Sequence, residues 1–315
     1  MRDAILALDI GGTTTTAAYV GPDHTVHARL SAPTPARDGA AAVVDRAVRL
    51  LATSRGQATA AGLAAPVALG IGTAGVVDPE GRTITHATDA LPGWAGTPLA
   101  RLAHRLTGLP TTVLGDVQAF LVGESTPRGA ARGARTAIGV MAGTGVGGAV
   151  WTEGTVLRGA RGAAGHIGHV PVPQAAGLTC PCGARDHVEA VASGPSMAAA
   201  LAAAGPQYAS VRTLQDVSRL AARGEARARG VLTRGGEALG TALAGLVATL
   251  DPDRVVISGG VLNSGPYYLA GLRDTLASHS LPALADTTVT ASRLGADAVL
   301  LGAAETARRT FREPS

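Results

Sequence analysis

AILALDIGGTTTTAAYVG, residues 4–21 of the chain, combines an apolar run, a pair of glycines and a β-branched run. β-Branched residues favour strands and glycine accepts tight turns, so this pattern predicts a β-hairpin with a glycine-rich tip. Residues 136–151, TAIGVMAGTGVGGAVW, repeat the pattern in a looser form. Two such hairpins indicate two halves of one architecture.

Strands and helices alternate between these hairpins, which favours an α/β fold. Residues 37–55 show the spacing of an amphipathic helix, and VALGIGTAGVV at 67–77 is typical of a buried strand. Residues 97–107 predict a helix with Thr97 as N-cap and Pro98 at its first position. The next strand, TTVLGD, ends at Asp116, and ligands of open α/β sheets collect at the carboxyl ends of strands.

The second half continues with a Cys- and His-bearing stretch at 162–194, Ala-rich helices across about 195–250, the strand RVVISGGV and a final helix near 295–312. A chain of 315 residues is long enough for two domains. We expect a small N-terminal lobe, 1–117, joined by the C-terminal helix at about 295–315. The larger lobe then covers 118–294.

Composition argues against several classes of protein. The net charge is +4, but all 27 basic residues are Arg and lie scattered, and aromatic residues make up only 3%. A nucleic-acid binder would cluster its basic residues and interleave aromatics. Because no secretion signal and no run of 18 apolar residues occurs, we expect a soluble, cytoplasmic protein without membrane contact.

The glycine-rich turns are candidate phosphate sites, because consecutive glycines let backbone N–H groups converge on an anion. Neither hairpin tip has the spacing of a P-loop, and the chain contains no lysine for one. Asp9 could orient Mg²⁺ through water, or it could stabilise the hairpin as an acceptor. Purely structural turns are the alternative for the candidates Gly11, Gly12, Thr13, Gly143, Thr144, Gly145, Gly259 and Gly260.

Eight motifs now stand in one order along nearly the whole chain: LDIGGT (8–13), GIGTAGVVDPEG (70–81), LPGW (91–94), GDVQA (115–119), GTGVGG (143–148), GHIGH (165–169), CPCG (180–183) and VEAVASG (188–194). In this set the sequence resembles the ROK family of repressors, open reading frames and sugar kinases. The resemblance implies a two-lobed, actin-like (ribonuclease H-like) ATPase fold with ATP and sugar in a cleft between the lobes. It also implies a homodimer and phosphorylation of a sugar 6-hydroxyl.

The resemblance assigns roles to individual residues. Asp116 matches the family's general base, although Gly115 stands where the family usually has Asn. Trp94 is a sugar platform or core packing. His166 replaces the usual sugar-binding Glu, as in the N-acetylmannosamine kinases of the family, and neutral His offers different hydrogen bonds from a carboxylate. The resulting candidates for sugar binding are Gly75, Asp89, Gly115, Asp116, His166, His169 and Glu189.

A structural zinc site is also implied. The family pattern is Gly-His followed by Cys-x-Cys-Gly-x-x-Gly-Cys, and here the last Gly-Cys pair is replaced by Asp186 and His187. A His in place of the fourth Cys keeps four tetrahedral ligands. The expected ligands are His169, Cys180, Cys182 and His187. The alternative is a loop whose cysteines no longer bind metal.

The expected function is ATP- and Mg²⁺-dependent phosphorylation of N-acetylmannosamine in amino sugar metabolism. A glucokinase or N-acetylglucosamine kinase is the close alternative, because one Glu-to-His exchange does not fix an epimer. Repressors of the family carry a winged helix-turn-helix before the DIGGT-like motif, where this sequence has eight residues, so a regulator is expected less. A catalytically silent sugar-binding protein is disfavoured by Asp116 and the two glycine tips.

Overall fold

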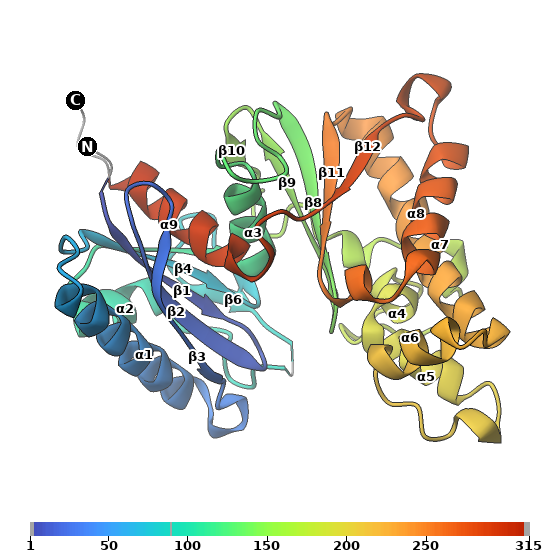
Figure 1. Ribbon diagram of the computed structural model, residues 1–315, viewed down its shortest axis with the longest axis horizontal. Coiled ribbons are helices and arrows are strands. Elements are labelled where there is room, and N and C mark those ends of the chain that lie inside the picture. Colours follow the sequence, from blue (N-terminus) through green and yellow to red (C-terminus); the bar gives the residue numbers. More distant parts are fainter. Residues whose placement is uncertain (1–2, 89, 312–315) are drawn as a thin grey trace. The chain divides into compact units, whose positions relative to one another are not determined.

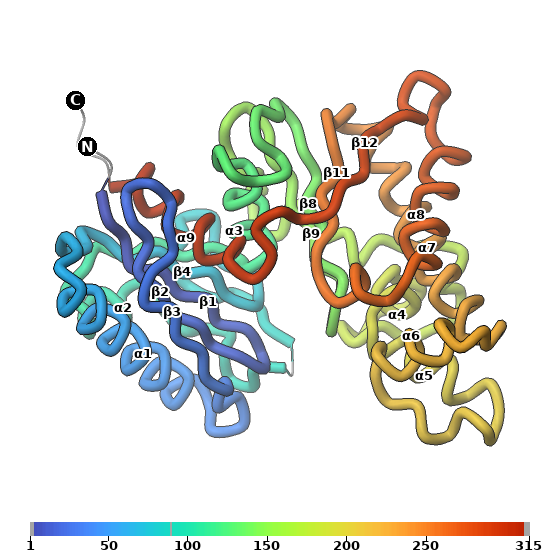
Figure 2. Tube along the Cα trace, viewed as in Figure 1, coloured from blue at the N-terminus to red at the C-terminus, as the bar shows by residue number. Residues whose placement is uncertain are grey.

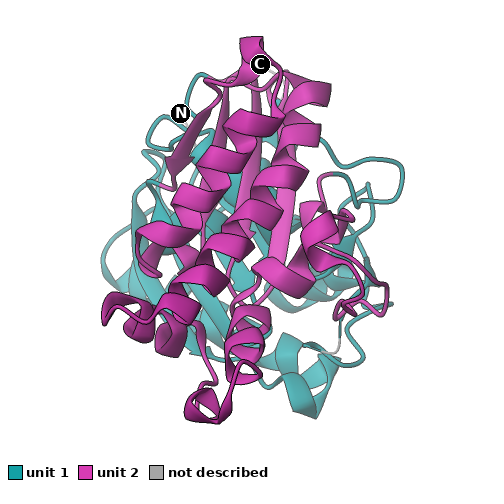
Figure 3. Cartoon of the chain, turned by 90° about the vertical axis from the view of Figure 1, so that its right-hand side faces the viewer, with its two compact units in different colours: residues 1–133, 155–164, 293–315 teal, residues 134–154, 165–292 magenta. Residues whose placement is uncertain are grey.

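The structure, a computed structural model, describes residues 3–88 and 90–311. The chain forms two compact units (Figures 1 and 3). Unit 1 consists of Met1–Gly133, Thr155–Ala164 and Arg293–Ser315, and unit 2 of Ala134–Gly154 and Gly165–Ser292. The expected lobe boundary near residue 117 falls inside unit 1, and the assignment of functional lobes stays a prediction.

Unit 1 is built on the predicted glycine hairpin. Strands β1 (Ile5–Ile10) and β2 (Thr14–Val20) pair antiparallel. The five-stranded sheet has the order β3-β2-β1-β4-β7, in which β1, β4 and β7 run parallel. The remaining strands of this unit are β3 (Val26–Pro33), β4 (Ala68–Thr73), β7 (Thr111–Gly115) and the short β5 (Val76–Val77), β6 (Ile84–His86) and β10 (Thr155–Val156).

Alternating side chains of β1 pack against helices on both faces of this sheet. Ile5 and Ala7 belong to a core with helix α9 (Ala298–Thr310), whereas Leu6, Leu8 and Ile10 pack with helices α1 (Ala40–Ala60) and α2 (Leu99–Thr107). A strand covered on both faces is apolar at nearly every position, which explains the apolar run at residues 4–8. Helix α3 (Asp116–Glu124) packs along α9.

The start of helix α2 differs from the prediction. The N-cap is Pro98, without a side-chain capping bond, and the helix begins at Leu99 instead of Pro98. Thr97 is buried, its carbonyl accepts from the Ile84 amide and its own amide donates to Trp94. These backbone bonds tie Thr97 to β6 and to the preceding turn, so the helix begins one residue later than its capping pattern predicts.

Unit 2 repeats the arrangement of strands. Strand β8 (Thr136–Ala142) pairs antiparallel with β9 (Val146–Thr152) and parallel with β11 (Arg254–Ser258), which pairs parallel with β12 (Thr288–Ala291). One large core joins this sheet to the helices of the unit. They are α4 (Glu189–Ala192), α5 (Gly194–Ala202), α6 (Leu214–Ala222), α7 (Ala226–Leu250) and α8 (Pro266–His279).

Helices α7 and α8 lie side by side (Figures 1 and 2). A Cβ at Gly236 of α7 would overlap the carbonyl oxygen of Tyr268 in α8, so a glycine is needed for this close approach. The chain then passes through β12 and enters α9, which belongs to unit 1 (Figure 2). Among the described residues, no helix has both the length and the apolar character that a bilayer crossing requires.

Candidate active site

The glycine tip of unit 1 carries the first group of predicted residues. The Gly11 amide donates to the carbonyl of Thr14 at 3.0 Å, and the Gly11 carbonyl accepts from the Thr34 hydroxyl at 2.7 Å. Thr13 at the tip is exposed. A Cβ added to Gly12 would lie 3.2 Å from that of Ala90, so a larger residue would press on the segment after β6. The tip is therefore fixed by its own backbone and open to a ligand at Thr13.

Asp9 and Asp116 lie at the carboxyl ends of parallel strands in unit 1. Asp9 pairs with Gly72 of β4, and Thr73 of β4 pairs with Gly115 of β7, directly before Asp116. Burial, and next the charge of Asp116, raise the pKa of Asp9 to about 7, while Arg29 opposes the shift. Burial raises the pKa of Asp116 to about 6. Two carboxylates that hold their protons this strongly favour a proton-transfer or cation site.

Helix α3 fixes the direction of Asp116. Asp116 is its first residue, and Asp116 Oδ1 accepts from the Val117 amide at 2.8 Å. Gln118, which the sequence analysis did not single out, accepts from the Gly115 amide at 3.3 Å through Oε1 and donates to the Gly162 carbonyl at 3.2 Å through Nε2. A residue with capping ability three positions after the N-cap is the signal that could have identified it.

The other end of α3 is also held. The buried Glu124 carboxylate accepts from the backbone amides of Ala130 at 2.6 Å and Leu294 at 3.0 Å.

Gly75, expected near the sugar, occupies the turn after β4 with φ +101°, where a Cβ would lie 2.7 Å from the His86 carbonyl oxygen. Its place is therefore explained by turn geometry.

Two expectations on the segment 87–96 have different outcomes. Asp89 lies outside the described residues. Trp94 is 1% exposed and donates its indole N–H to the Thr73 hydroxyl at 3.1 Å. Trp94 therefore packs in the core, and the alternative of an exposed sugar platform is wrong for the described structure.

The glycine corners of unit 2 lie next to each other. The Gly143 amide donates to the Gly145 carbonyl at 2.9 Å, and a Cβ at Gly143 would lie 3.7 Å from the Gly260 amide nitrogen. Gly259 has φ +97°, and a Cβ there would overlap the Ala142 carbonyl. Thr144 is exposed at the tip. The turns 143–145 and 259–260 thus form one glycine-lined surface with converging backbone groups.

Two residues beside this surface were missed. The Gly194 amide donates to the Gly143 carbonyl at 2.8 Å, and a Cβ on Gly194 would lie 3.3 Å from that of Leu214. A Cβ on Gly260 would lie 3.7 Å from a Leu214 methyl group. Gly194 was within the quoted motif VEAVASG, but no local pattern connects Leu214 to the glycine turns.

The predicted metal ligands gather in unit 2. One ligand atom from each of His169, Cys180, Cys182 and His187 lies within 4.8 Å of all the others. The Cys180 sulfur is 3.7 Å from His169 Nδ1, and the Cys182 sulfur is 3.3 Å from His187 Nδ1. Tetrahedral zinc with Zn–S of about 2.3 Å and Zn–N of about 2.0 Å places such atoms about 3.6 Å apart. The donor set and its spacing therefore fit Zn²⁺.

Two of the sugar candidates, His166 and Glu189, lie beside this cluster. The rings of His166 and His169 are stacked with centroids 6.2 Å apart, and those of His169 and His187 are 5.4 Å apart. Burial, aided by the charges of Cys182 and Glu189, raises the pKa of Cys180 to about 11. One Glu189 carboxylate oxygen accepts from the Val146 amide at 2.7 Å. The cluster, Glu189 and the turn 143–148 are thus neighbours within unit 2.

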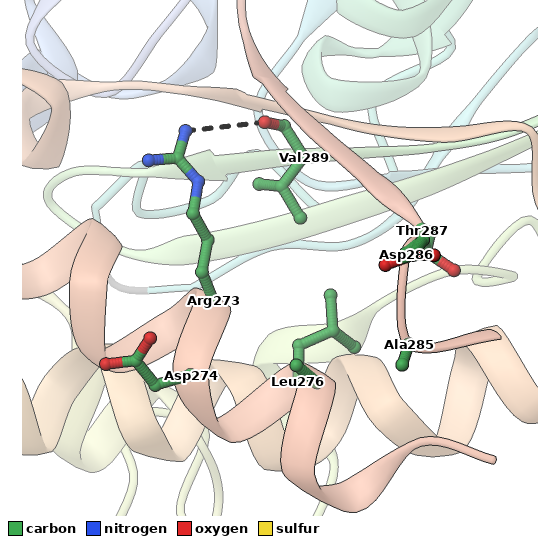
Figure 4. A pocket seen from close by; sticks show the side chains of 8 residues that line it. Arg273, Asp274, Leu276, Ala285, Asp286, Thr287 and Val289 are labelled. Atoms are coloured by element: carbon green, nitrogen blue, oxygen red, sulfur yellow. Dashed lines mark hydrogen bonds between the residues drawn. The ribbon is translucent and has the colours of Figure 1, made fainter. Parts of the chain in front are cut away.

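Two recesses lie apart from the predicted residues. One, of about 290 Å³, lies between α8 and residues 285–289, where Arg273 donates to the Val289 carbonyl at 3.4 Å (Figure 4). The other, of about 610 Å³, is an apolar groove of unit 1 lined by α1, α2 and residues 93–98. None of the candidate residues in the described part of the chain lines either one.

A sequence model of the ROK family matches residues 5–310. The chain belongs to the ROK family. It is 36% identical to the N-acetylmannosamine kinase of Citrobacter koseri, over 95% of this chain and 97% of that one. It is 31% identical to the glucokinase of Thermotoga maritima, over 95% and 96% of the two chains.

Solved structures agree with this family membership. A ROK family glucokinase from Streptomyces griseus, in complex with glucose and AMPPNP, superposes with a TM-score of 0.82 at 28% identity, over 97% of this chain and 99% of that one. The likeness confirms the expected fold class of this ROK protein, the α/β actin-like ATPase fold. The eight motifs quoted from the sequence therefore identified the family correctly.

Proposed function

We propose that this ROK protein transfers the γ-phosphate of ATP to the 6-hydroxyl of N-acetylmannosamine, with Asp116 as general base. The observation that carries this proposal is the half-buried Asp116 carboxylate, which directly follows the carboxyl end of β7 and has a pKa raised to about 6. A base works best when its pKa is near the working pH. The coarser assignment, a sugar kinase, is supported by the relatives named N-acetylmannosamine kinase and glucokinase.

Asp116, the glycine turns and Asp9 each have a separate role in the proposed reaction. The Val117 amide holds Oδ1 of Asp116, and we assign Oδ2 to accept the proton as the sugar hydroxyl attacks the phosphorus. We assign the glycine turns to phosphate binding through backbone amides. Asp9 fits a Mg²⁺ held through water, because burial and the charge of Asp116 disfavour its carboxylate and a nearby cation would offset both. When bound, Mg²⁺ neutralises charge on the transferred phosphate.

The choice of sugar rests on His166. A carboxylate only accepts hydrogen bonds, whereas a neutral imidazole donates from one nitrogen and accepts at the other. His166 stacks on His169, so its ring is held at the edge of the metal cluster. The relatives named N-acetylmannosamine kinase support an N-acetylated sugar, and those named glucokinase support glucose as the rival.

We assign structural Zn²⁺ to His169, Cys180, Cys182 and His187. A bound zinc would hold residues 169–187 together, a segment that contains no strand of its own in the described structure apart from isolated bridges. We expect about one zinc per chain, measured by mass spectrometry of the metal. The variant His187→Ala should lose this zinc. A homodimer and a cytoplasmic location stay predictions from the sequence.

A coupled ADP-release assay tests the sugar. We expect the highest kcat/KM with N-acetylmannosamine, among N-acetylmannosamine, N-acetylglucosamine, glucose and fructose. The matched variant His166→Glu restores the acceptor carboxylate of most family members, and it should shift preference toward glucose or N-acetylglucosamine. If the unmodified protein prefers glucose, the role given to His166 is wrong.

A further inference from the structure

The Glu189 carboxylate contacts the glycine turn directly. Its Oε2 accepts from the Val146 amide at 2.7 Å, and Val146 is the first residue of β9, directly after the turn residues Gly143–Gly145. Val146 is 3% exposed, so water has little access to this amide. A buried N–H that loses its acceptor is costly, and a carboxylate is a strong acceptor. The sugar candidate Glu189 therefore also holds the end of the phosphate turn.

The neighbouring glycine provides independent support. A Cβ on Gly145 would lie 2.7 Å from Glu189 Oε2, closer than real Cβ contacts. Gly145 is not among the glycines with positive φ, so its backbone conformation is open to other residues. A side chain at position 145 would therefore displace the Glu189 carboxylate, although the backbone conformation itself would allow it.

The segment GHIGH packs on the same strand. A Cβ on Gly168 would overlap the Val146 carbonyl oxygen, and a Cβ on Gly148 would overlap the Gly165 carbonyl. Val146 therefore has contacts on both sides. Its N–H donates to Glu189, and its carbonyl packs closely against Gly168 of the segment that bears His166 and His169. Backbones in such contact cannot shift independently.

We propose that Glu189 is a positioning residue for the phosphate-binding residues 143–148. Through this contact, the positions of the sugar-binding and nucleotide-binding residues of unit 2 are coupled. The proposal rests on the proposed kinase function, because that function assigns ligands to the two sets. A change that breaks the contact between Glu189 and residues 145–146 should then alter the affinity for both ligands. If Glu189 acted on the sugar alone, the nucleotide affinity would stay unchanged.

The test measures binding without turnover. Calorimetry would give the affinity of the full chain for Mg²⁺·AMPPNP without sugar, and for N-acetylmannosamine and glucose without nucleotide. Glu189→Ala should weaken AMPPNP binding about tenfold or more, because the Val146 amide loses a charged acceptor. Glu189→Gln keeps an acceptor oxygen for that amide, so its AMPPNP affinity should stay within about twofold of the unmodified protein, while sugar affinity falls.

A pair of glycine variants tests the reverse direction. Gly145→Ala places a methyl group against Glu189 and should weaken sugar binding as well as AMPPNP binding. Gly143→Ala is the matched control, because its methyl group meets only the Gly260 amide at 3.7 Å. It should alter AMPPNP binding alone.

Two results would overturn the proposal. One is an AMPPNP affinity of Glu189→Ala within twofold of the unmodified protein, and the other is a Glu189→Gln variant as weak as Glu189→Ala. If Glu189→Ala does not fold, the Gln variant and the glycine pair still decide. These readouts need no catalysis, so a failure of Asp116 as base would leave them interpretable, and the two sugars cover an error in the substrate.

Discussion

The glycine hairpins of the two units share a strand arrangement but differ in their acidic partner. In each, the first strand pairs antiparallel with the second and parallel with a later strand. In unit 1 the carboxylate, Asp9, belongs to the hairpin itself. In unit 2 the carboxylate, Glu189, lies 43 positions beyond the amide it contacts, Val146.

The difference also concerns how each carboxylate is satisfied. Glu189 accepts a hydrogen bond from a buried backbone amide. The half-buried Asp9 and Asp116 instead have pKa values raised to about 7 and about 6, although Asp116 also accepts from the Val117 amide. A charge that burial disfavours is costly to keep and is typical of a reacting group. Near the two hairpins, unit 1 thus carries carboxylates whose charged form burial disfavours, and unit 2 carries a carboxylate that holds a backbone amide. The comparison suggests that a repeated backbone can place chemistry in one half and ligand holding in the other.

The largest expected effect comes from removing the Asp116 charge. Asp116→Asn keeps an oxygen for the Val117 amide but cannot accept a proton, so kcat should fall by roughly 10²- to 10⁴-fold. AMPPNP affinity should stay close to that of the unmodified protein. Initial rates in the ADP-release assay check this, with Asp38→Asn, an exposed residue of the same unit, as control. Near-normal turnover of Asp116→Asn would remove this residue from the mechanism and end the contrast between the units.

The same variant should be more stable at neutral and alkaline pH. The pKa of Asp116 is about 6 in the folded state and 3.8 when unperturbed, so between these values the folded state binds more protons than the unfolded one. The free energy of unfolding therefore falls as pH rises from about 4 to about 6 and stays lowered above. The cost at pH 8 is about 3 kcal/mol.

Urea unfolding of Asp116→Asn and of the unmodified protein at pH 4 and pH 8 measures this cost. The variant should be more stable at pH 8 by up to that amount, and the two proteins should converge at pH 4. A variant that is less stable than the unmodified protein at pH 8 would show that Asp116 is a stabilising group like Glu189. The two carboxylates would then not differ as described.

Much of this structure could be predicted from local patterns. The hairpin at 4–21 and the strand before Asp116 were identified from short patterns, although that strand ends at Gly115, and the four candidate metal ligands were identified from the family motif. Each depends on residues near one another in the sequence, or on a family motif that records distant contacts. Local patterns and family motifs therefore predicted the elements and the family better than the tertiary contacts of single residues.

The missed features depend on tertiary contacts. Thr97 has the residue type of an N-cap, but backbone bonds to Ile84 and Trp94 start the helix one residue later. The sequence left core packing of Trp94 open, because no pattern in LPGW indicates that its indole N–H donates to Thr73. Gln118 reaches Gly162 over 44 positions of sequence. Contacts of this kind appear only when strands and helices are placed in three dimensions.

The smallest expected effect comes from removing Gln118. This variant tests whether the environment of Asp116 in unit 1 is as fixed as that of Glu189 in unit 2. Gln118→Ala removes the acceptor of the Gly115 amide and the donor to Gly162, so the first turn of α3 should admit water. Hydration favours the charged carboxylate, and the pKa of Asp116 should therefore move from about 6 toward its ordinary range.

The acidic limb of kcat/KM against pH reports this shift. It should lie near pH 6 in the unmodified protein and at lower pH in Gln118→Ala, with kcat at pH 8 only a few fold reduced. Gln57→Ala, on the exposed face of α1, is the control and should leave the limb in place. A Gln118→Ala variant that is less stable but has an unmoved limb would mean that burial by the rest of the unit, and not the cap of α3, sets the basicity of Asp116.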